Sequence, residues 1–261
     1  MGDGAMTPPT ARILPGHWRA VDFISDLHLA ASMPATFQAW ADHLQHTDAD
    51  AVIIVGDLFE VWVGDDARHR GFEAACLDVL SSASSHRWLG FLHGNRDFLL
   101  GPAMAADCGL TLLPDPTLLQ AWGRRVLVTH GDEWCLSDVD YQAFRRTVRS
   151  PGWQREFLAR PLGERLQLAA QMRRESRARQ AFDGRPGADV DVPTAVSWLD
   201  ACGADTLVHG HTHRPGTDRL GETMTRHVLS DWDLDDPSSP RADVLRWTAD
   251  GFERRPPATS P

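Results

Sequence analysis

The sequence predicts a layered α/β fold, and two patterns in it support this. Five short apolar runs rich in β-branched residues each stop at polar or turn-forming residues: AVDFIS, AVIIV, WLGFLH, RVLVT and DTLV. Such runs are typical of buried strands. Helical patterns lie between several of them, at 34–46, 67–82 and 193–202. Strands that alternate with helices predict at least one mainly parallel sheet.

The length and composition allow a substantial core. The chain has 261 residues, 42% of them hydrophobic, which suffices for one large α/β domain or two small ones. We expect one main domain over 18–253, with Pro-rich, mobile tails at 1–17 and 254–261. No stretch approaches the ~20 apolar residues of a membrane span, and the N-terminal segment does not resemble a signal peptide. We therefore expect a protein that is soluble or at most peripheral to a membrane.

The four cysteines lie far apart and form no CxxC pair. This usage predicts reduced thiols in a cytosolic protein and not a disulfide framework. The cysteines are Cys76, Cys108, Cys135 and Cys202.

Strand signals stop between about Ser137 and Asp189, where helix-forming, arginine-rich sequence predicts a helical insertion or cap over 137–189. The formal net charge of -10 argues against general binding of nucleic acid. Between Tyr141 and Gly187, however, eleven arginines stand against four acidic residues. This basic segment suggests an anionic partner such as phosphate groups or a membrane surface. A solvated helix face is the alternative.

Polar residues follow each of the five apolar runs. They are Asp26 and His28; Asp57; Asn95, Arg96 and Asp97; His130; and His209, His211 and His213. Loops at the carboxyl ends of strands converge on one crevice in layered α/β folds. A carboxylate shared by two cations, with imidazoles and an amide oxygen around it, would make a two-metal site. Nitrogen and oxygen ligands without thiolate suit Mn, Fe, Zn or Ni.

Each residue alone has a simpler interpretation. Asp26 could cap a turn, Asp57 could be a turn residue after Gly56, and His130 could be a hydrogen-bonded core histidine. Asn95 suits a turn with positive φ. Their occurrence in order, each after an apolar run, favours the metal site.

These motifs, D-x-H, G-D, G-N-[RH]-[DE], H-G and G-H-x-H, resemble the calcineurin-like metallophosphoesterase family over roughly Val21 to Leu229. The resemblance implies a two-layered β-sandwich flanked by helices and two divalent metals, most simply Mn²⁺. One metal would be held by Asp26, His28, Asp57 and His213. The other would be held by Asp57, Asn95, His130 and His211, with Asp57 bridging. Gly210 would allow a tight turn, and His209 would pack behind the ligands.

Longer stretches are similar to one branch of this family, which acts in lipid A biosynthesis. They are GDLFEVWVGDD, HGNRDFLLG, HGDEWCLSDVDYQAFRR and LVHGHTHRP. The resemblance implies hydrolysis of the pyrophosphate bond of UDP-2,3-diacylglucosamine to UMP and 2,3-diacylglucosamine 1-phosphate, by metal-hydroxide attack on the α-phosphate. It also implies a peripheral position on the cytoplasmic face of the inner membrane.

The reaction also follows from the residue types. Two cations ~3.5–4 Å apart acidify a bridging water and neutralise the attacked phosphoryl group. The catalytic residues would be Asp57, Asn95, Arg96 and His130. Many relatives have histidine where this chain has Arg96, which stays protonated and is a poor proton donor. Arg96 therefore favours pyrophosphate cleavage, whose phosphate leaving group needs no proton. A turn-stabilising role is the alternative.

By resemblance, substrate contacts map to Asn95, Arg96, Asp138, Ser176 and His211. Gln180 stands where asparagine is usual and Asp183 where lysine is usual, so Arg179 or Arg185 could substitute for that lysine. Arg173 and Arg177 are candidates for a diphosphate or lipid headgroups.

Apolar residues of the insertion could line an acyl-chain cleft or form the core of a helical cap. They are Phe144, Val148, Trp153, Phe157, Leu158, Leu162, Leu166, Leu168 and Met172.

Two other classes of function remain open. One is hydrolysis of another nucleotide or dinucleotide polyphosphate on the same fold. The other is a binding protein without catalysis, which the complete set of seven candidate ligands disfavours.

Overall fold

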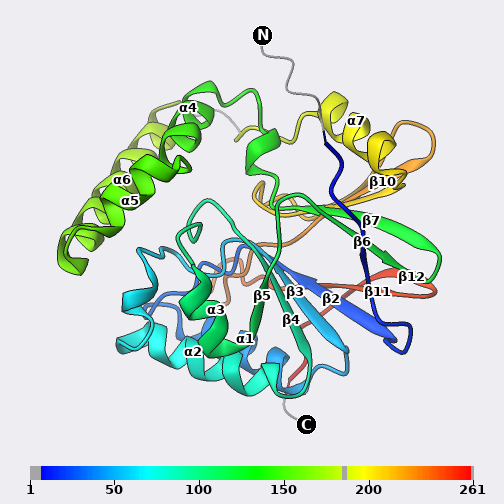
Figure 1. Ribbon diagram of the computed structural model, residues 1–261, viewed down its shortest axis with the longest axis horizontal. Helices are drawn as coiled ribbons and strands as arrows, with labels where there is room; N and C mark the ends of the chain where they lie inside the picture. Colours follow the sequence, from blue (N-terminus) through cyan, green and yellow to red (C-terminus); the bar gives the residue numbers. More distant parts are fainter. Residues whose placement is uncertain (1–6, 184–186, 260–261) are drawn as a thin grey trace.

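The computed structural model describes residues 7–183 and 187–259, with side chains outside 176–183. Two six-stranded sheets pack face to face, with helices on their outer sides (Figure 1). One sheet has the order β12-β11-β2-β3-β4-β5, and the other has β1-β6-β7-β8-β10-β9. The two-layered sandwich expected from the sequence is therefore confirmed.

The strands of the first sheet are β2 (Ala20–Ile24), β3 (Ala51–Val55), β4 (Trp88–Leu92), β5 (Leu110–Leu112), β11 (Val244–Thr248) and β12 (Gly251–Arg255). Those of the second are β1 (Arg12–Ile13), β6 (Thr117–Ala121), β7 (Arg124–Thr129), β8 (Thr206–His209), β9 (Gly216–Leu220) and β10 (Met224–Val228). The five predicted strands are confirmed as β2, β3, β4, β7 and β8. Within each sheet these strands pair in parallel, so their carboxyl ends point the same way.

Four helices cover the outer faces: α1 (Pro34–His46), α2 (Gly71–Ser84), α3 (Pro102–Cys108) and α7 (Val192–Cys202). The helix predicted at 34–46 is confirmed, and that at 193–202 begins one residue earlier. The helix predicted at 67–82 instead begins at Gly71, because a 3₁₀ turn, Asp65–Ala67, precedes it. The Asp65 carboxylate accepts hydrogen bonds from the backbone of Gly101 and Met104, which ties this turn to α3.

The core between the sheets combines fully buried side chains from both layers, among them Phe23, Val55, Val128, Val208 and Trp247. Burial of apolar surface contributes roughly 25 cal/mol per Å². This packing fixes the strands, and with them the loops at their carboxyl ends.

The segment 137–189 contains three helices, α4 (Val139–Val148), α5 (Pro151–Leu158) and α6 (Leu162–Asp183), which lie together beside the sandwich (Figure 1). Ser150 caps α5 by accepting a hydrogen bond from the Trp153 backbone at 3.3 Å. Phe157 is buried in the core next to the first sheet, and Trp153, Leu162 and Leu168 pack against it. Phe144, Leu158 and Leu166 are exposed. Some apolar residues of the insertion therefore form a packed core, and others are free to contact acyl chains.

Several residues of the two tails that were predicted to be mobile contact the rest of the fold. Arg12 and Ile13 pair with β6, and the Leu14 side chain beside them is buried. At the other end β12 continues to Arg255, and the Ala258 backbone donates to His43 Nδ1 at 3.1 Å.

Two further expectations concern cysteines and membranes. All four cysteines are free and buried, as predicted. In the described part of the chain, no helix is long and apolar enough to cross a membrane.

Candidate metal centre

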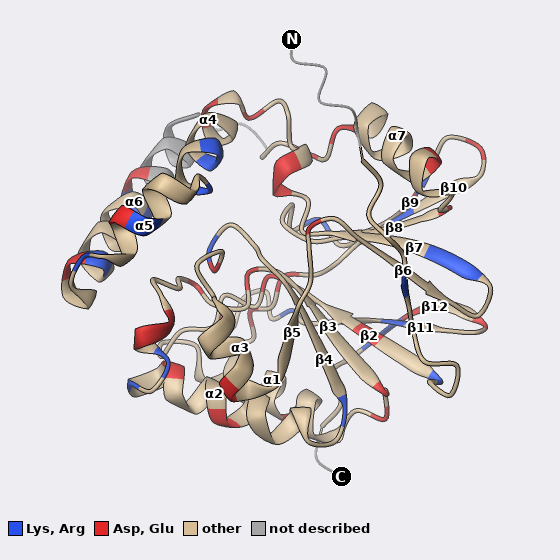
Figure 2. Ribbon diagram, in the orientation of Figure 1, with Lys and Arg blue, Asp and Glu red and all other residues tan. Residues whose placement is uncertain are grey.

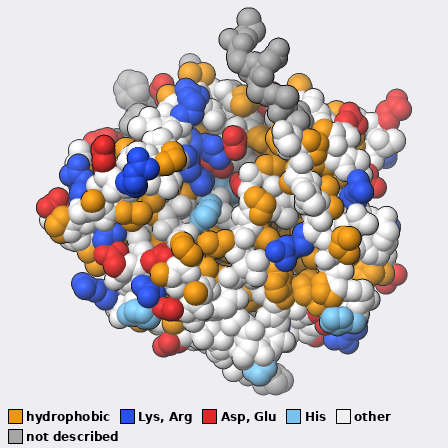
Figure 3. Space-filling view, in the orientation of Figure 1, with side chains coloured by type: hydrophobic (Ala, Val, Ile, Leu, Met, Phe, Trp, Pro, Cys, Tyr) orange, Lys and Arg blue, Asp and Glu red, His pale blue; other side chains and the backbone are white. Residues whose placement is uncertain are grey.

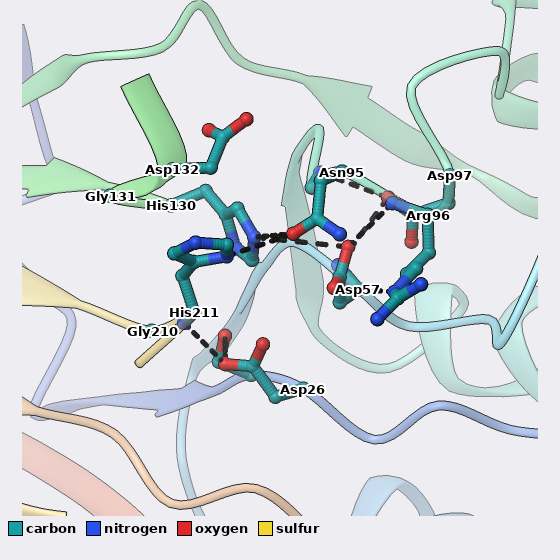
Figure 4. A network of polar contacts seen from close by, with 12 residues as sticks. Asp26, Asp57, Asn95, Arg96, Asp97, His130, Gly131, Asp132, Gly210 and His211 are labelled. Carbon is teal, nitrogen blue, oxygen red and sulfur yellow. Dashed lines mark hydrogen bonds and ion pairs between the residues drawn. The ribbon is translucent and has the colours of Figure 1, made fainter. Parts of the chain in front are cut away.

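The structure brings the seven predicted metal ligands together where the loops of both sheets meet, and Figure 4 shows five of them: Asp26, Asp57, Asn95, His130 and His211. Five of them have a left-handed backbone, with φ between 49° and 67°: Asp26, His28, Asp57, His211 and His213. This conformation is uncommon for residues other than glycine and costs about 1–3 kcal/mol each. Such strain is typical of functional sites, where the surrounding fold holds the side chains in place. Asn95 is not among these residues, so the turn with positive φ considered for it is absent.

Asp26, His28 and His213 form a first group of ligand atoms. Asp26 Oδ1 lies 3.4 Å from His213 Nε2 and 4.0 Å from His28 Nε2, and the two histidine nitrogens are 3.2 Å apart. Asp26 Oδ1 is buried and has no hydrogen-bond partner among the described residues. A buried, unpartnered carboxylate oxygen facing two imidazole nitrogens fits a divalent cation.

Asn95, His130 and His211 form a second group. Asn95 Oδ1 lies 3.1 Å from His130 Nε2 and 2.9 Å from His211 Nδ1 (Figure 4). His130 Nδ1 is 2.9 Å from the Val55 carbonyl, which can only accept a hydrogen bond. Nδ1 therefore carries a proton, and in the neutral ring Nε2 offers its lone pair to a metal.

Asp57 lies between the two groups. Its Oδ1 is 3.8 Å from His130 Nε2, and its Oδ2 is 4.0 Å from His28 Nδ1. The Arg96 backbone donates to Asp57 Oδ1 at 2.8 Å. Asp57 therefore stands where a ligand shared by two metals would stand.

Two glycines make room for these carboxylates. A Cβ on Gly94 would lie 2.1 Å from Asp57 Oδ1, and one on Gly210 would lie 2.0 Å from Ser25 Oγ and 2.4 Å from Asp26 Oδ2. The chain turns tightly after Gly210, where the Thr212 backbone donates to the Gly210 carbonyl at 2.8 Å, but Gly210 does not have a positive φ, so the turn is not what requires glycine. Glycine is required there because the backbone passes directly against Asp26.

Burial and neighbouring charges perturb the titration of the carboxylates. Burial raises the pKa of Asp57 to about 7, and the charges of Asp97 and Asp26 add to this effect although His130 opposes it. Burial would also raise the pKa of Asp26, but the close approach of His213 and the nearby histidine charges hold it well below its usual range.

The histidines divide into two classes. Burial lowers the pKa of His28 to about 3 and that of His211 to about 4, so both rings are neutral and available as ligands. Burial opposes protonation of His130 as well, but the charges of Asp57, Asp26 and Asp132 raise its pKa to about 9. The centre therefore binds positive charge, which a proton or a metal can supply.

The structure describes the side chains of only some of the predicted substrate contacts. The Arg96 side chain is 21% exposed, with its Nε 3.7 Å from Asp57 Oδ2, so it lies at the rim of the centre. Asp138 caps α4 by accepting from the Tyr141 backbone at 3.0 Å. Ser176, Gln180 and Asp183 lie on α6, and their side chains fall outside the described residues, as do those of Arg177, Arg179 and Arg185.

Two predictions outside the ligand set have clear outcomes. His209 is fully buried with Nδ1 2.9 Å from the Gly210 carbonyl, which confirms its packing role behind the ligands. Arg173 forms an ion pair with Glu60 in this structure, where the sequence suggested an anionic headgroup.

Four carboxylates that support the ligands were predicted neither as metal ligands nor as substrate contacts. Glu60 Oε2 lies 3.6 Å from His28 Nδ1, and Asp231 Oδ2 lies 3.5 Å from His213 Nδ1. Asp97 accepts from the backbone of Leu58 at 2.7 Å and of Gly94 at 2.9 Å, which joins two ligand loops. The fourth, Asp132, accepts a hydrogen bond from Arg145 Nε at 2.9 Å. Asp97 and Asp132 are visible as acidic residues within the motifs, whereas no pattern in the sequence marks Glu60 or Asp231.

This chain is similar to known proteins in sequence and in structure. The sequence profile described as calcineurin-like phosphoesterase matches residues 20–215. The UDP-2,3-diacylglucosamine hydrolase of Bordetella pertussis is 41% identical over 88% of this chain and 92% of that protein. The protein of the same name from Stenotrophomonas maltophilia is 41% identical over 89% of this chain and 98% of its own length. A solved phosphoesterase from E. coli is 13% identical, with a TM-score of 0.42 over 91% of this chain and 99% of that one.

Proposed function

Because the chain belongs to the calcineurin-like phosphoesterase family, we propose that it hydrolyses the pyrophosphate bond of UDP-2,3-diacylglucosamine. The products are UMP and 2,3-diacylglucosamine 1-phosphate, an intermediate of lipid A biosynthesis. The observation that carries the proposal is that two buried carboxylates, four imidazoles and Asn95 lie together, with Arg96 beside the shared Asp57. The names of the relatives support the choice of substrate.

The ligand set fits two divalent cations, and we propose Mn²⁺ for both. Asp26, His28 and His213 would hold one, Asn95, His130 and His211 the other, and Asp57 would contact both. When bound, the cations supply an acidified water and neutralise charge on the attacked phosphoryl group. The absence of thiolate and the mixture of nitrogen and oxygen donors suit Mn²⁺ among other metals of its class.

Arg96 supplies a further contact to the phosphoryl group. Its guanidinium keeps its charge at any working pH and can hold a phosphoryl oxygen through paired hydrogen bonds. It does not deliver a proton to the leaving group, and a phosphate leaving group does not need one. Arg96 therefore suits cleavage of a phosphoanhydride better than cleavage of a phosphomonoester.

The insertion supplies a surface for the lipid. All but one of the large exposed apolar residues that the structure describes lie in the insertion or beside it: Leu136, Val139, Phe144, Leu158, Leu166 and Val192. Arginines lie along the same helices (Figure 2), and a histidine lies in a hollow of the surface between these helices and the sandwich (Figure 3). Exposed apolar residues next to cations fit acyl chains and anionic headgroups. We propose a peripheral position on the cytoplasmic face of the inner membrane, which these exposed apolar residues and arginines would support.

The test is hydrolysis of UDP-2,3-diacylglucosamine with added Mn²⁺, beside metal-stripped protein and the Asp57→Ala variant. Release of UMP that requires metal and is absent in the variant supports the proposal. Metal-dependent cleavage of ordinary nucleotides, without cleavage of the lipid, would favour the other nucleotide hydrolases of this fold.

A further inference from the structure

Helix α4 turns one face towards a single buried carboxylate of the sandwich. Tyr141, Arg145 and Arg149 are spaced by four residues, so they lie in a row on the helix and its C-cap. The Tyr141 hydroxyl and Arg145 Nε both donate to Asp132 Oδ2, and Arg149 Nη2 lies 3.8 Å from the same oxygen. Asp132 is fully buried and follows His130 by two residues. The row therefore holds the loop that carries His130.

The first residue of the row also reaches another candidate ligand. The Tyr141 ring lies against the His211 ring, with centroids 5.8 Å apart and an interplanar angle of 32°. Next to it, Gln142 Nε2 donates to the carbonyls of Asp132 and Cys135 at 2.8 and 3.2 Å. The start of α4 is thus fixed beside both His130 and His211.

The last residue of the row reaches the loop of Asn95. Arg149 Nη2 donates to the Gly94 carbonyl at 2.9 Å, and its guanidinium carbon lies 4.9 Å above the centre of the Phe98 ring. The Gly94 carbonyl belongs to the peptide unit that carries the Asn95 nitrogen. Gly94 is itself pressed against Asp57. Arg149 therefore fixes the orientation of the peptide from which Asn95 projects.

The first group of ligands is not held in this way. Among the described residues, α4 makes no hydrogen bond or ion pair with Asp26, His28 or His213. The insertion approaches that group through α6, where Arg173 pairs with Glu60 and Glu60 in turn lies 3.6 Å from His28. Among the ligand loops that the structure describes, the polar contacts of α4 and its C-cap reach only those of the second group.

We infer that α4 assembles the second metal site, formed by Asp57, Asn95, His130 and His211, and that Arg149 is the residue that positions Asn95 in it. This inference rests on the two-metal centre of the proposed function. It predicts that the two sites differ in their dependence on α4: the first forms without contacts from this helix, and the second is completed by its docking.

The experiment is titration of metal-stripped full-length protein with Mn²⁺ by calorimetry. Wild-type protein should bind two ions. Arg149→Ala should leave one site unchanged and weaken the other about 10- to 100-fold, as loss of a supporting hydrogen bond does at other metal sites. Arg149→Lys should recover part of the affinity, because an ammonium can still donate to the Gly94 carbonyl but cannot lie flat on Phe98.

Arg146→Ala is the matched control, since Arg146 is exposed on the same helix and should leave both affinities as in wild type. Hydrogen exchange of metal-free protein gives a second measurement: residues 93–98 should exchange faster in Arg149→Ala, and residues 25–29 should not.

Equal affinities in Arg149→Ala and wild type would overturn the inference, and so would equal weakening of both sites. Wild-type protein that binds two Mn²⁺ ions but leaves the UDP-lipid intact would contradict the proposed function alone. Wild-type protein that binds only one ion would overturn the inference itself.

Discussion

The sandwich loops and the helical insertion face the same hollow, but they differ in which side chains they bury and which they expose. The loops bury their charged side chains and hold five ligands in left-handed backbone conformations. The insertion exposes large apolar side chains and is rich in arginine within a chain of net charge -10. A strained, buried centre can bind metal and perform chemistry, whereas an exposed apolar surface can adapt to a substrate. The difference assigns catalysis to the sandwich and lipid recognition to the insertion.

The strongest test of the sandwich is loss of the shared ligand. Asp57→Ala removes a carboxylate from both metals and should lower the rate of UMP release on the order of 10³-fold or more. The rate is measured with saturating Mn²⁺. Asp78→Ala, which changes an exposed carboxylate on α2, should behave as wild type. Turnover of Asp57→Ala near the wild-type rate would remove the sandwich centre from the reaction.

Removal of the Arg96 guanidinium, at the rim of the metal centre, should lower the rate somewhat less than loss of Asp57 does. Arg96→Ala should reduce kcat for the UDP-lipid about 10²- to 10³-fold, because a preorganised donor to the phosphoryl group is lost. Arg96→Lys should retain part of the rate, since it keeps the charge but not the paired geometry. Near-normal turnover of Arg96→Ala, measured under saturating substrate, would reduce this residue to a turn-stabilising role.

The pKa shifts predict that metal binding depends on pH. Neighbouring carboxylates raise the pKa of His130 to about 9 against the effect of burial, and burial raises the pKa of Asp57 to about 7. A metal must displace these protons, so affinity for Mn²⁺ should fall about tenfold per pH unit for each proton displaced as the pH is lowered. Calorimetry in buffers of different ionisation enthalpy should detect release of protons on binding. An affinity that stays constant from about pH 6 to pH 9 would contradict these shifts.

The smallest expected change in activity comes from a substitution in the insertion, which tests whether substrate recognition is separate from catalysis. Leu158 is 43% exposed, so Leu158→Asp should preserve the fold but weaken contact with an acyl chain. We expect KM for the UDP-lipid to rise about 5- to 10-fold, from partial loss of an apolar contact. Cleavage of a small phosphodiester without acyl chains should be unchanged. A parallel loss of both activities would mean that the insertion does not separate recognition from catalysis.

The contrast between the two regions also explains what the sequence predicts well. β2, β3, β4, β7 and β8 are mainly apolar and buried, and a ligand follows each within three residues of its end, so the strands and the ligands were found together. The strands β9 and β12 lie at sheet edges and carry exposed polar side chains, so their patterns are weak.

The partners of the ligands depend on tertiary contacts that no local pattern encodes. Asp231 meets His213 only because the chain after β10 returns to the centre, and Glu60 meets Arg173 across more than a hundred residues. Local sequence likewise suggested mobility at Arg12 and Ile13, where pairing with β6 decides the structure.

The central claim is that the buried centre directs water to the α-phosphate of the UDP-lipid. Hydrolysis in ¹⁸O-labelled water, followed by mass spectrometry of both products, tests it most directly. We predict that the label enters UMP and that 2,3-diacylglucosamine 1-phosphate stays unlabelled. Label in the lipid phosphate would show attack on the other phosphorus and would contradict the proposed placement of the substrate over Asp57 and Arg96.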